Sequence, residues 1–389
     1  MSMAGTENGG GTGLRQPARI TERAGLVDAG RIVVKIGSSS LTDSNGRLDQ
    51  LRVQEIATTC AWLGSEGTEV VIVSSGAIAA ALGPLGLEQR PDSVDLQQAA
   101  ASVGQALLAT AWSTAFGDHG RITGQVLLTE SDVIRPQTYR NVRNALEALM
   151  GLGAFPVVNE NDTTATHEIR FGDNDRLAAL VAQLLGADAL FLLTDVDGLY
   201  TAPPQEPGAT RIGVVEDAAR LAGVSIGSVG SKIGTGGMVT KLSAAQLAST
   251  TGTAAVLTSA SKFAAAATGE DIGTFFPGHH GRRRSRLVWL RFATRGAGTL
   301  VLDEGAAEAM RTRRRSLLAV GITGVEGTFP DGVPVDIAAP DGEVIARGLT
   351  SFSSDELRAM TGRGSAELRE LLGERFRRPV VHRDHLVVL

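Results

Sequence analysis

Residues 159–175, NENDTTATHEIRFGDND, carry side chains that could bind a polar ligand or a metal ion. The segment lies between an apolar run at 154–158 and a helical pattern, so it is a connection, and it is longer than the usual length of about 2–6 residues. The alternating oxygen ligands and spaced final Glu of an EF-hand are absent. A solvated surface loop and part of an active site both fit the pattern. The polar residues are five carboxylates, Glu160, Asp162, Glu168, Asp173 and Asp175, and three amides, Asn159, Asn161 and Asn174.

Lysine is rare in this chain, which has 37 basic residues of which four are lysine. Arginine supplies the rest, so a lysine marks a position where a compact point charge could be needed. Lys35 and Lys241 lie beside glycine-rich turns, and we expect both to have a functional role. The other two lysines are Lys232 and Lys262.

Three apolar runs, at 31–36, 69–73 and 189–193, end in small polar residues. Continuous apolar runs predict strands buried on both faces of a parallel sheet, and ligands of open α/β sheets bind at the carboxyl ends of such strands. Ordinary tight connections with a serine cap are the alternative. The first turn is not a P-loop, because its lysine precedes the glycine. The residues at the three ends are Gly37 to Ser40, Ser74 to Ala77, and Thr194 with Asp195.

The segment Gly234 to Lys241, GTGGMVTK, precedes a helical pattern that runs through Leu242 and Ala248. A glycine-rich turn at a helix start presents backbone N–H groups and favours a bound phosphate. A flexible linker is the alternative, but linkers rarely end in an amphipathic helix.

Strands and helices alternate from residue 31 to about residue 276, which predicts an α/β fold with a mainly parallel sheet sandwiched by helices. From residue 298 short strands and turn signals predict a small β-rich domain, including a hairpin around Pro340-Asp341-Gly342. The chain is therefore divided into a disordered leader at 1–28, an α/β domain at 29–278, an arginine-rich linker at 279–297 and a β-rich domain at 298–389.

The composition is typical of a globular protein: 43% of residues are hydrophobic, 20% are charged, and the net charge is −5. The acidic balance gives no reason to expect nucleic-acid binding.

The single cysteine, Cys60, excludes a disulfide framework and fits a reducing compartment. No apolar run reaches the ~18 residues of a membrane span, and the N-terminus lacks the pattern of a signal peptide. We therefore expect a cytoplasmic protein.

Together the motifs resemble the glutamate 5-kinases (gamma-glutamyl kinases) of the amino acid kinase superfamily. The similar segments, in chain order, are VVKIGSSSLT, VSSGAIAA, VNENDTTATHEIRFGDND, LLTDVDGLYT and GTGGMVTK. GTLVLDEGA and VVHRDHL near the C-terminus resemble the PUA domain of many bacterial members. The resemblance implies the amino acid kinase fold for 29–278 and a PUA domain for 298–389. It also implies ATP-dependent phosphorylation of the side-chain carboxylate of L-glutamate to glutamyl 5-phosphate, the first step of proline biosynthesis.

Site residues follow from the resemblance position by position. Lys35, Lys241, Asp173 and Asp175 would be catalytic, with the lysines on the transferring phosphoryl group and the carboxylates orienting them. Ser75, Gly76, Asp162 and Asn174 would bind glutamate. The nucleotide would be bound by Lys35, Gly37, Thr194, Asp195, Thr235, Gly236, Gly237, Met238, Val239, Thr240 and Lys241.

The resemblance also implies the other ligands and partners. ATP is the phosphoryl donor and Mg²⁺ the metal, held through ATP and water with no direct protein ligand. We further expect proline as a feedback inhibitor, a glutamyl phosphate reductase as recipient of the product, and a homo-oligomer, either dimer or tetramer. Neither a membrane nor RNA bound through the PUA domain is expected as a partner.

Three other functions remain compatible with parts of the chain. The arginines at 279–316 and the PUA-like tail would suit an RNA-binding protein, which a salt-dependent binding titration would identify. A regulatory protein on an inactive kinase scaffold would show no ATP turnover. A related kinase acting on another acid would show a different substrate preference.

Overall fold

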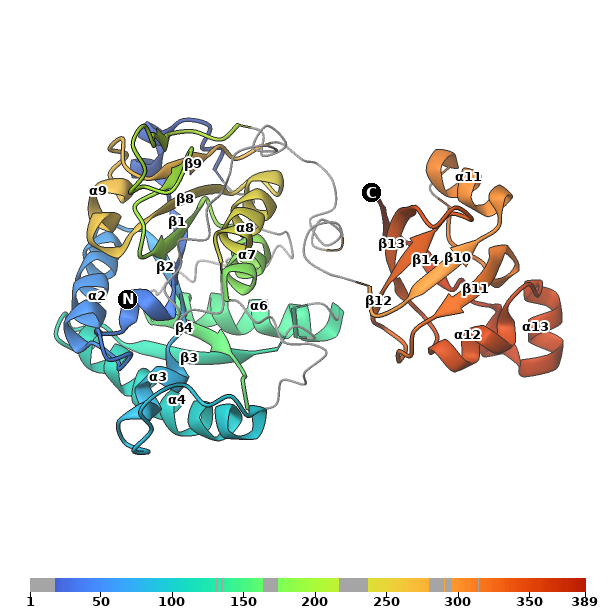
Figure 1. The fold of residues 1–389 in the computed structure, drawn as a ribbon, viewed down its shortest axis with the longest axis horizontal. Helices are drawn as coiled ribbons and strands as arrows, with labels where there is room; N and C mark the ends of the chain where they lie inside the picture. Colours follow the sequence, from blue (N-terminus) through green and yellow to red (C-terminus); the bar gives the residue numbers. More distant parts are fainter. Residues whose placement is uncertain are drawn as a thin grey trace, which may run out of the picture. The chain divides into compact units, whose positions relative to one another are not determined.

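The computed structural model describes residues 18–129, 132–133, 136–163, 174–216, 237–279, 290, 296–313 and 315–389. The chain forms two compact units, residues 1–279 and residues 280–389. Each is described separately here (Figure 1).

The described part of the first unit is built on a seven-stranded sheet. All neighbouring strands pair in parallel except the last, which runs antiparallel to its neighbour. The central strands are buried along their whole length, as expected for strands covered on both faces. In spatial order the strands are β3 (Thr123–Leu128), β4 (Phe155–Glu160), β2 (Glu69–Ser74), β1 (Arg31–Ile36), β5 (Ala189–Thr194), β8 (Ala254–Ser259) and β9 (Thr274–Phe276).

Helices cover both faces of this sheet (Figure 1). Helices α2 (Gln50–Ser65), α4 (Val94–Gly117) and α9 (Phe263–Ala267) pack their apolar side chains against alternate residues of β1, β2, β4, β5 and β8. Helices α6 (Pro136–Gly151), α7 (Asn174–Leu185) and α8 (Met238–Thr250) lie on the other face. The predicted α/β sandwich is confirmed. The remaining elements are α1 (Ser38–Leu41), α3 (Ala77–Leu82), the 3₁₀ helices η1 (Arg23–Asp28) and η3 (Ala260–Lys262), and a hairpin of β6 (Leu199–Tyr200) and β7 (Arg211–Ile212).

The segment 159–175 is not one connection, contrary to the prediction. Asn159 and Glu160 belong to β4, where they pair with Leu127 and Leu128 of β3 and are buried. The strand continues past its apolar run because the ladder with β3 continues there. At the other end Asp175 lies within α7, which is buried on nearly all sides.

Residues 18–28, assigned to the leader from composition, are ordered and pack against the first unit. Ile20 and Leu26 join the hydrophobic core. The guanidinium of Arg23 donates to the carbonyls of Gly213 at 2.7 Å and Gly273 at 3.3 Å. Two buried apolar side chains and a bonded arginine therefore attach this segment to the unit.

Cys60 lies in α2 with no exposed surface. Burial raises the pKa of its thiol far above the ordinary value, because a buried thiolate loses its hydration. We expect Cys60 not to react with Ellman's reagent in the native protein and to react fully after unfolding in guanidinium chloride. The release of thionitrobenzoate measures this, and rapid labelling of the native chain would contradict the burial.

The second unit is a small β-rich domain around a five-stranded sheet. Strands β12 (Pro334–Ala338) and β13 (Val344–Thr350) form the predicted hairpin, and Gly342 in its turn has a φ of 86°. Within the described residues, no helix of either unit combines the length and apolarity needed to cross a bilayer. In spatial order the strands are β11 (Ile322–Glu326), β10 (Thr299–Leu302), β12 (Pro334–Ala338), β13 (Val344–Thr350) and β14 (Val381–Val388), with helices α11 (Glu304–Arg313), α12 (Ser354–Met360) and α13 (Ser365–Leu372) and 3₁₀ helices η4 (Ala319–Gly321) and η5 (Glu374–Arg377).

Candidate active site

The order of the strands places β1 at a topological switch point. The chain continues from β1 to β2 on one side, whereas β5 lies on its other side. Ligands of open α/β sheets bind outside the carboxyl ends of the strands at such a point. The N–H of Gly37 donates to the carbonyl of Leu193 at 3.3 Å, and the N–H of Ser75 donates to the carbonyl of Ile36 at 3.1 Å. The three predicted strand ends therefore meet at one edge of the sheet.

Two buried lysines share one buried carboxylate at this edge. Asp175 has no exposed surface, and its Oδ1 forms an ion pair with the Nζ of Lys35. Its Oδ2 lies 3.2 Å from the Nζ of Lys241 and accepts a hydrogen bond from the Thr240 hydroxyl at 3.1 Å. Lys35 comes from β1, Lys241 from the first turns of α8, and Asp175 from the first turn of α7. Elements far apart in the sequence thus bring the two lysines together.

This group gathers ionised side chains in a buried place. Two ammonium groups meet one carboxylate there, and the lysine residues are only 3% and 7% exposed. Burying a charge is costly unless a partner compensates it. Asp175 is such a partner for both lysines, and ammonium groups at a strand end also suit an anion such as a phosphoryl group.

A second group consists of amide and hydroxyl side chains. The Nδ2 of Asn174 donates to the Ser75 hydroxyl at 2.9 Å, to the carbonyl of Ser74 at 3.2 Å and to the Oδ1 of Asn159 at 3.0 Å. The Nδ2 of Asn159 donates in turn to the Oε1 of Gln105 at 2.7 Å. The group offers neutral hydrogen-bonding partners, which suit the polar end of a small substrate.

Consecutive residues join the two groups at the start of α7. Asn174 belongs to the amide group and Asp175 to the lysine group. One ligand could therefore be held by the amide group at one end and present a reactive atom to the lysines at the other.

Known proteins are similar to this chain along nearly its whole length. Residues 30–259 match the amino acid kinase family, and residues 298–372 match the PUA domain. The chain belongs to the amino acid kinase family. Three relatives, each named glutamate 5-kinase, come from Bifidobacterium adolescentis, Thermobifida fusca and Salinispora arenicola. They are 49%, 50% and 52% identical to this chain over 97%, 97% and 93% of its length, and over 100%, 97% and 98% of their own.

Other predicted site residues of this amino acid kinase lie around the two groups. Gly37 is at the N-terminus of α1, where an added Cβ would lie 3.6 Å from the Nζ of Lys35. Gly76 precedes α3 with a φ of 102°, a left-handed conformation that favours glycine. Gly237 precedes α8, which begins with Met238 and Val239. Asp162 lies in the turn after β4.

Thr194 and Asp195 lie at the end of β5, where the Thr194 hydroxyl donates to the Asp195 carboxylate at 2.8 Å. Beyond them Asp197 contacts the Nζ of Lys262 at 2.6 Å and accepts from the Tyr200 hydroxyl at 2.8 Å. The hydrogen bond from Lys262 lowers the pKa of Asp197, and the adjacent carboxylate raises the pKa of Tyr200. These groups form a charged rim beside the strand end that the nucleotide is expected to contact.

Asp173, Thr235 and Gly236, which were also predicted to be site residues, lie outside the described residues. Among those that are described, no three His, Cys, Asp or Glu side chains are grouped as they would be to hold a metal ion. Both oxygens of Asp175 contact ammonium groups, so this carboxylate is a poor direct ligand for a cation.

Sequence reasoning missed the contribution of α4 to the site. Gln105 bonds Asn159, and the indole N–H of Trp112 donates to the Ser74 hydroxyl at 2.9 Å. The only available signal was the spacing of polar side chains in an alanine-rich helix.

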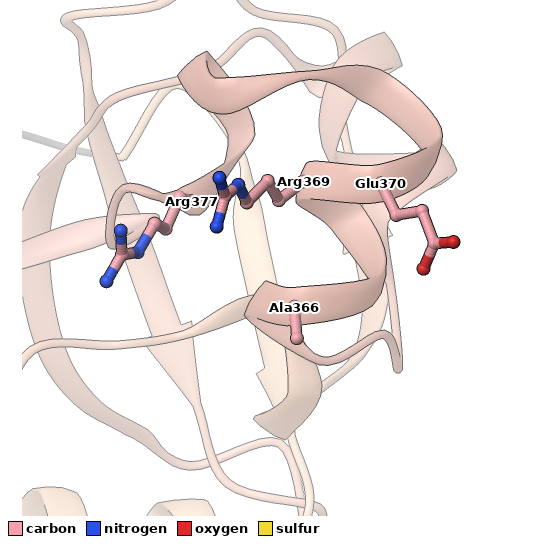
Figure 2. Close-up of a pocket in the computed structure, with 4 residues that line it drawn as sticks. All are labelled: Ala366, Arg369, Glu370 and Arg377. Carbon is pink, nitrogen blue, oxygen red and sulfur yellow. The ribbon is translucent and has the colours of Figure 1, made fainter.

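The second unit has an open pocket of about 620 Å³. Figure 2 shows Arg369 and Arg377 extending to one side of α13 and Glu370 to the other. Arg369 is paired with Glu374 at 2.5 Å. The pocket holds none of the predicted site residues, so the candidate active site belongs to the first unit.

Proposed function

We propose that the chain transfers a phosphoryl group from ATP to the side-chain carboxylate of L-glutamate, giving glutamyl 5-phosphate in the first step of proline biosynthesis. The observation that carries the proposal is the buried Asp175 carboxylate between Lys35 and Lys241 at the switch point of the sheet. The choice of glutamate as the substrate is supported by relatives named glutamate 5-kinase, which match along nearly the whole chain.

The chemistry requires charge compensation rather than a general base. The nucleophile is a carboxylate, which is already ionised at neutral pH. The main obstacle is repulsion between this anion and the phosphates of ATP, and phosphoryl transfer is catalysed mostly by positioning and electrostatic stabilisation. Lys35 and Lys241 provide the positive charge on the transferring group, while Asp175, with Asp173, holds the lysines in place.

The two ends of the site have separate tasks. Ser75, Gly76, Asp162 and Asn174 bind glutamate, and the ammonium of the amino acid is held by the carboxylate and amide oxygens among them. The nucleotide is bound by Lys35, Gly37, Thr194, Asp195 and the turn Thr235 to Lys241.

Magnesium would be held through ATP and water, with no direct protein ligand. This fits a carboxylate whose oxygens contact lysine ammonium groups. When bound, Mg²⁺ neutralises phosphate charge. Asp173 and Asp175 orient its water shell rather than bind it directly.

The remaining features are proposed from the family. The kinase domain spans 29–278, the linker 279–297 and the PUA domain 298–389, in a cytoplasmic dimer or tetramer. Proline is the feedback inhibitor. An acyl phosphate reacts readily with water, so a glutamyl phosphate reductase is the recipient of the product. RNA is not proposed as a ligand of the PUA domain.

Hydroxylamine trapping tests the function. The full chain is incubated with ATP, Mg²⁺ and hydroxylamine, and with glutamate, aspartate, N-acetylglutamate or carbamate as acceptor. We expect a strong acyl hydroxamate signal with glutamate alone. A stronger signal with another acid would identify a related kinase. An acyl hydroxamate signal that does not depend on ATP, or no signal at all, would contradict a kinase.

A further inference from the structure

Helix α4 directs polar side chains toward the site although its sequence from Leu96 to Gly117 contains no charged residue. Ser102 lies 3.1 Å from the Thr163 hydroxyl, and Gln105 accepts a hydrogen bond from Asn159. Trp112 donates to the Ser74 hydroxyl. These positions, i, i+3 and i+10, share one side of a helix. Helix α4 is therefore a support for the amide group as well as part of the core.

Backbone groups fix the orientation of the side-chain amides of Asn159 and Asn174. The N–H of Glu160 can only donate, and it bonds the Oδ1 of Asn159 at 2.8 Å. The Asn159 amide is thus oriented with its Nδ2 toward Gln105, which must present its oxygen. The carbonyl of Ser74 can only accept, so the Asn174 amide turns its Nδ2 toward Ser74 and Asn159. Neither asparagine can be reversed without placing two acceptors, or two donors, against each other.

The orientation leaves two groups for a ligand. The Ser75 hydroxyl already accepts from Asn174, so its proton remains to be donated, and it has no acceptor within the described part of the chain. The Oδ1 of Asn174 is buried and has no hydrogen-bond partner there either. An unpaired buried acceptor is costly. An α-amino acid carries the complement: an ammonium that donates and a carboxylate that accepts.

We propose that Gln105 is a positioning residue for the amino-acid substrate, acting through Asn159 to hold Asn174 and Ser75 in the orientation that receives an α-amino acid head group. The inference rests on the proposed function, because it takes glutamate as the ligand. Gln105 itself does not touch the substrate. The Gln105 side-chain oxygen accepts the last hydrogen bond of the series that runs from Ser75 through Asn174 and Asn159. Losing this acceptor frees the Asn159 side chain and loosens Asn174.

Three variants of the full-length chain test the proposal by steady-state kinetics. Gln105→Met is close in shape to glutamine and helix-forming, but it cannot accept the bond from Asn159. Gln105→Glu keeps an acceptor oxygen at the same place. Gln97→Met makes the same exchange on the same helix, where the glutamine amide bonds the carbonyl of Pro91 instead. Thermal melting of each variant accompanies the kinetics.

The loss of one hydrogen bond predicts a glutamate KM about fivefold to tenfold higher in Gln105→Met. Its kcat and its KM for ATP are expected within about twofold of the starting protein. Gln105→Glu recovers most of the glutamate KM, and Gln97→Met leaves it unchanged. An unchanged KM in Gln105→Met, equal losses in all constants, or the same effect from Gln97→Met would overturn the positioning role. The starting protein is the reference: if it does not phosphorylate glutamate, the proposed function itself fails.

Discussion

Replacement of Lys241 by methionine is expected to lower kcat about 100-fold to 1000-fold, the usual loss for one preorganised group that stabilises a transition state. The glutamate KM should change by less than about threefold, because the carboxylate that Lys241 contacts, Asp175, belongs to the lysine group and not to the amide group. An interaction made mainly in the transition state lowers kcat without weakening the ground-state complex. Initial rates of ADP release, measured over a matrix of glutamate and ATP concentrations, separate the two constants.

The fold should tolerate this change. Methionine is similar in length to lysine and forms helices well. Removing one ammonium leaves Asp175 paired with Lys35, so this buried carboxylate keeps a partner of opposite charge. The melting temperature is therefore expected to stay close to that of the starting protein.

Lys262→Met is the matched control. Lys262 also pairs with a carboxylate, Asp197, but its side chain is 47% exposed and it lies outside the lysine group. An exposed ion pair contributes little, so kcat should fall by less than about tenfold. Equal losses of kcat and glutamate affinity in Lys241→Met, or equal kcat losses in both variants, would remove Lys241 from its transition-state role.

The sheet and the lysine pair could be predicted because their signals are local. The largely apolar runs at 31–36 and 189–193 were predicted to be buried strands, and both are buried along their whole length. The scarcity of lysine and the neighbouring glycine-rich turns singled out Lys35 and Lys241. The rule for strand ends concerned the turn after Lys35, and the family resemblance implied that Lys241 joins it. The ion pairs with Asp175 then follow from ordinary electrostatics in a buried place.

Features that depend on partners distant in the sequence could not be predicted. Asn159 and Glu160 are polar, and only their pairing with β3 keeps them in a strand. Arg23 resembles any residue of a polar leader until the carbonyls of Gly213 and Gly273 accept its hydrogen bonds. In the sequence, nothing distinguishes Gln105 from the other glutamines of an alanine-rich helix. Each is defined by a tertiary contact rather than by a pattern.

The position of α4 is set by a glycine. An added Cβ at Gly104 would lie 1.7 Å from the carbonyl oxygen of Ala77, which belongs to the backbone of α3 and cannot rotate away. The two helices therefore touch at Gly104, one residue before Gln105. The contact fixes the distance between α4 and the turn that contains Ser75.

Gly104→Ala is accordingly expected to destabilise the protein by about 3 kcal/mol or more, because overpacking against backbone forces the helices apart. For a unit of this size that corresponds to a fall in melting temperature of about 6–12 °C. Gly117→Ala is the control at the last residue of the same helix: apart from the adjoining backbone nothing lies within 4 Å of its added Cβ, and it should change the stability by less than about 1 kcal/mol. Scanning calorimetry compares the two. A Gly104→Ala protein that melts within about 2 °C of the starting protein would show that α3 and α4 are not in contact there.

If the contact holds, any folded fraction of Gly104→Ala should also bind glutamate more weakly, since the displaced helix carries Gln105 with it.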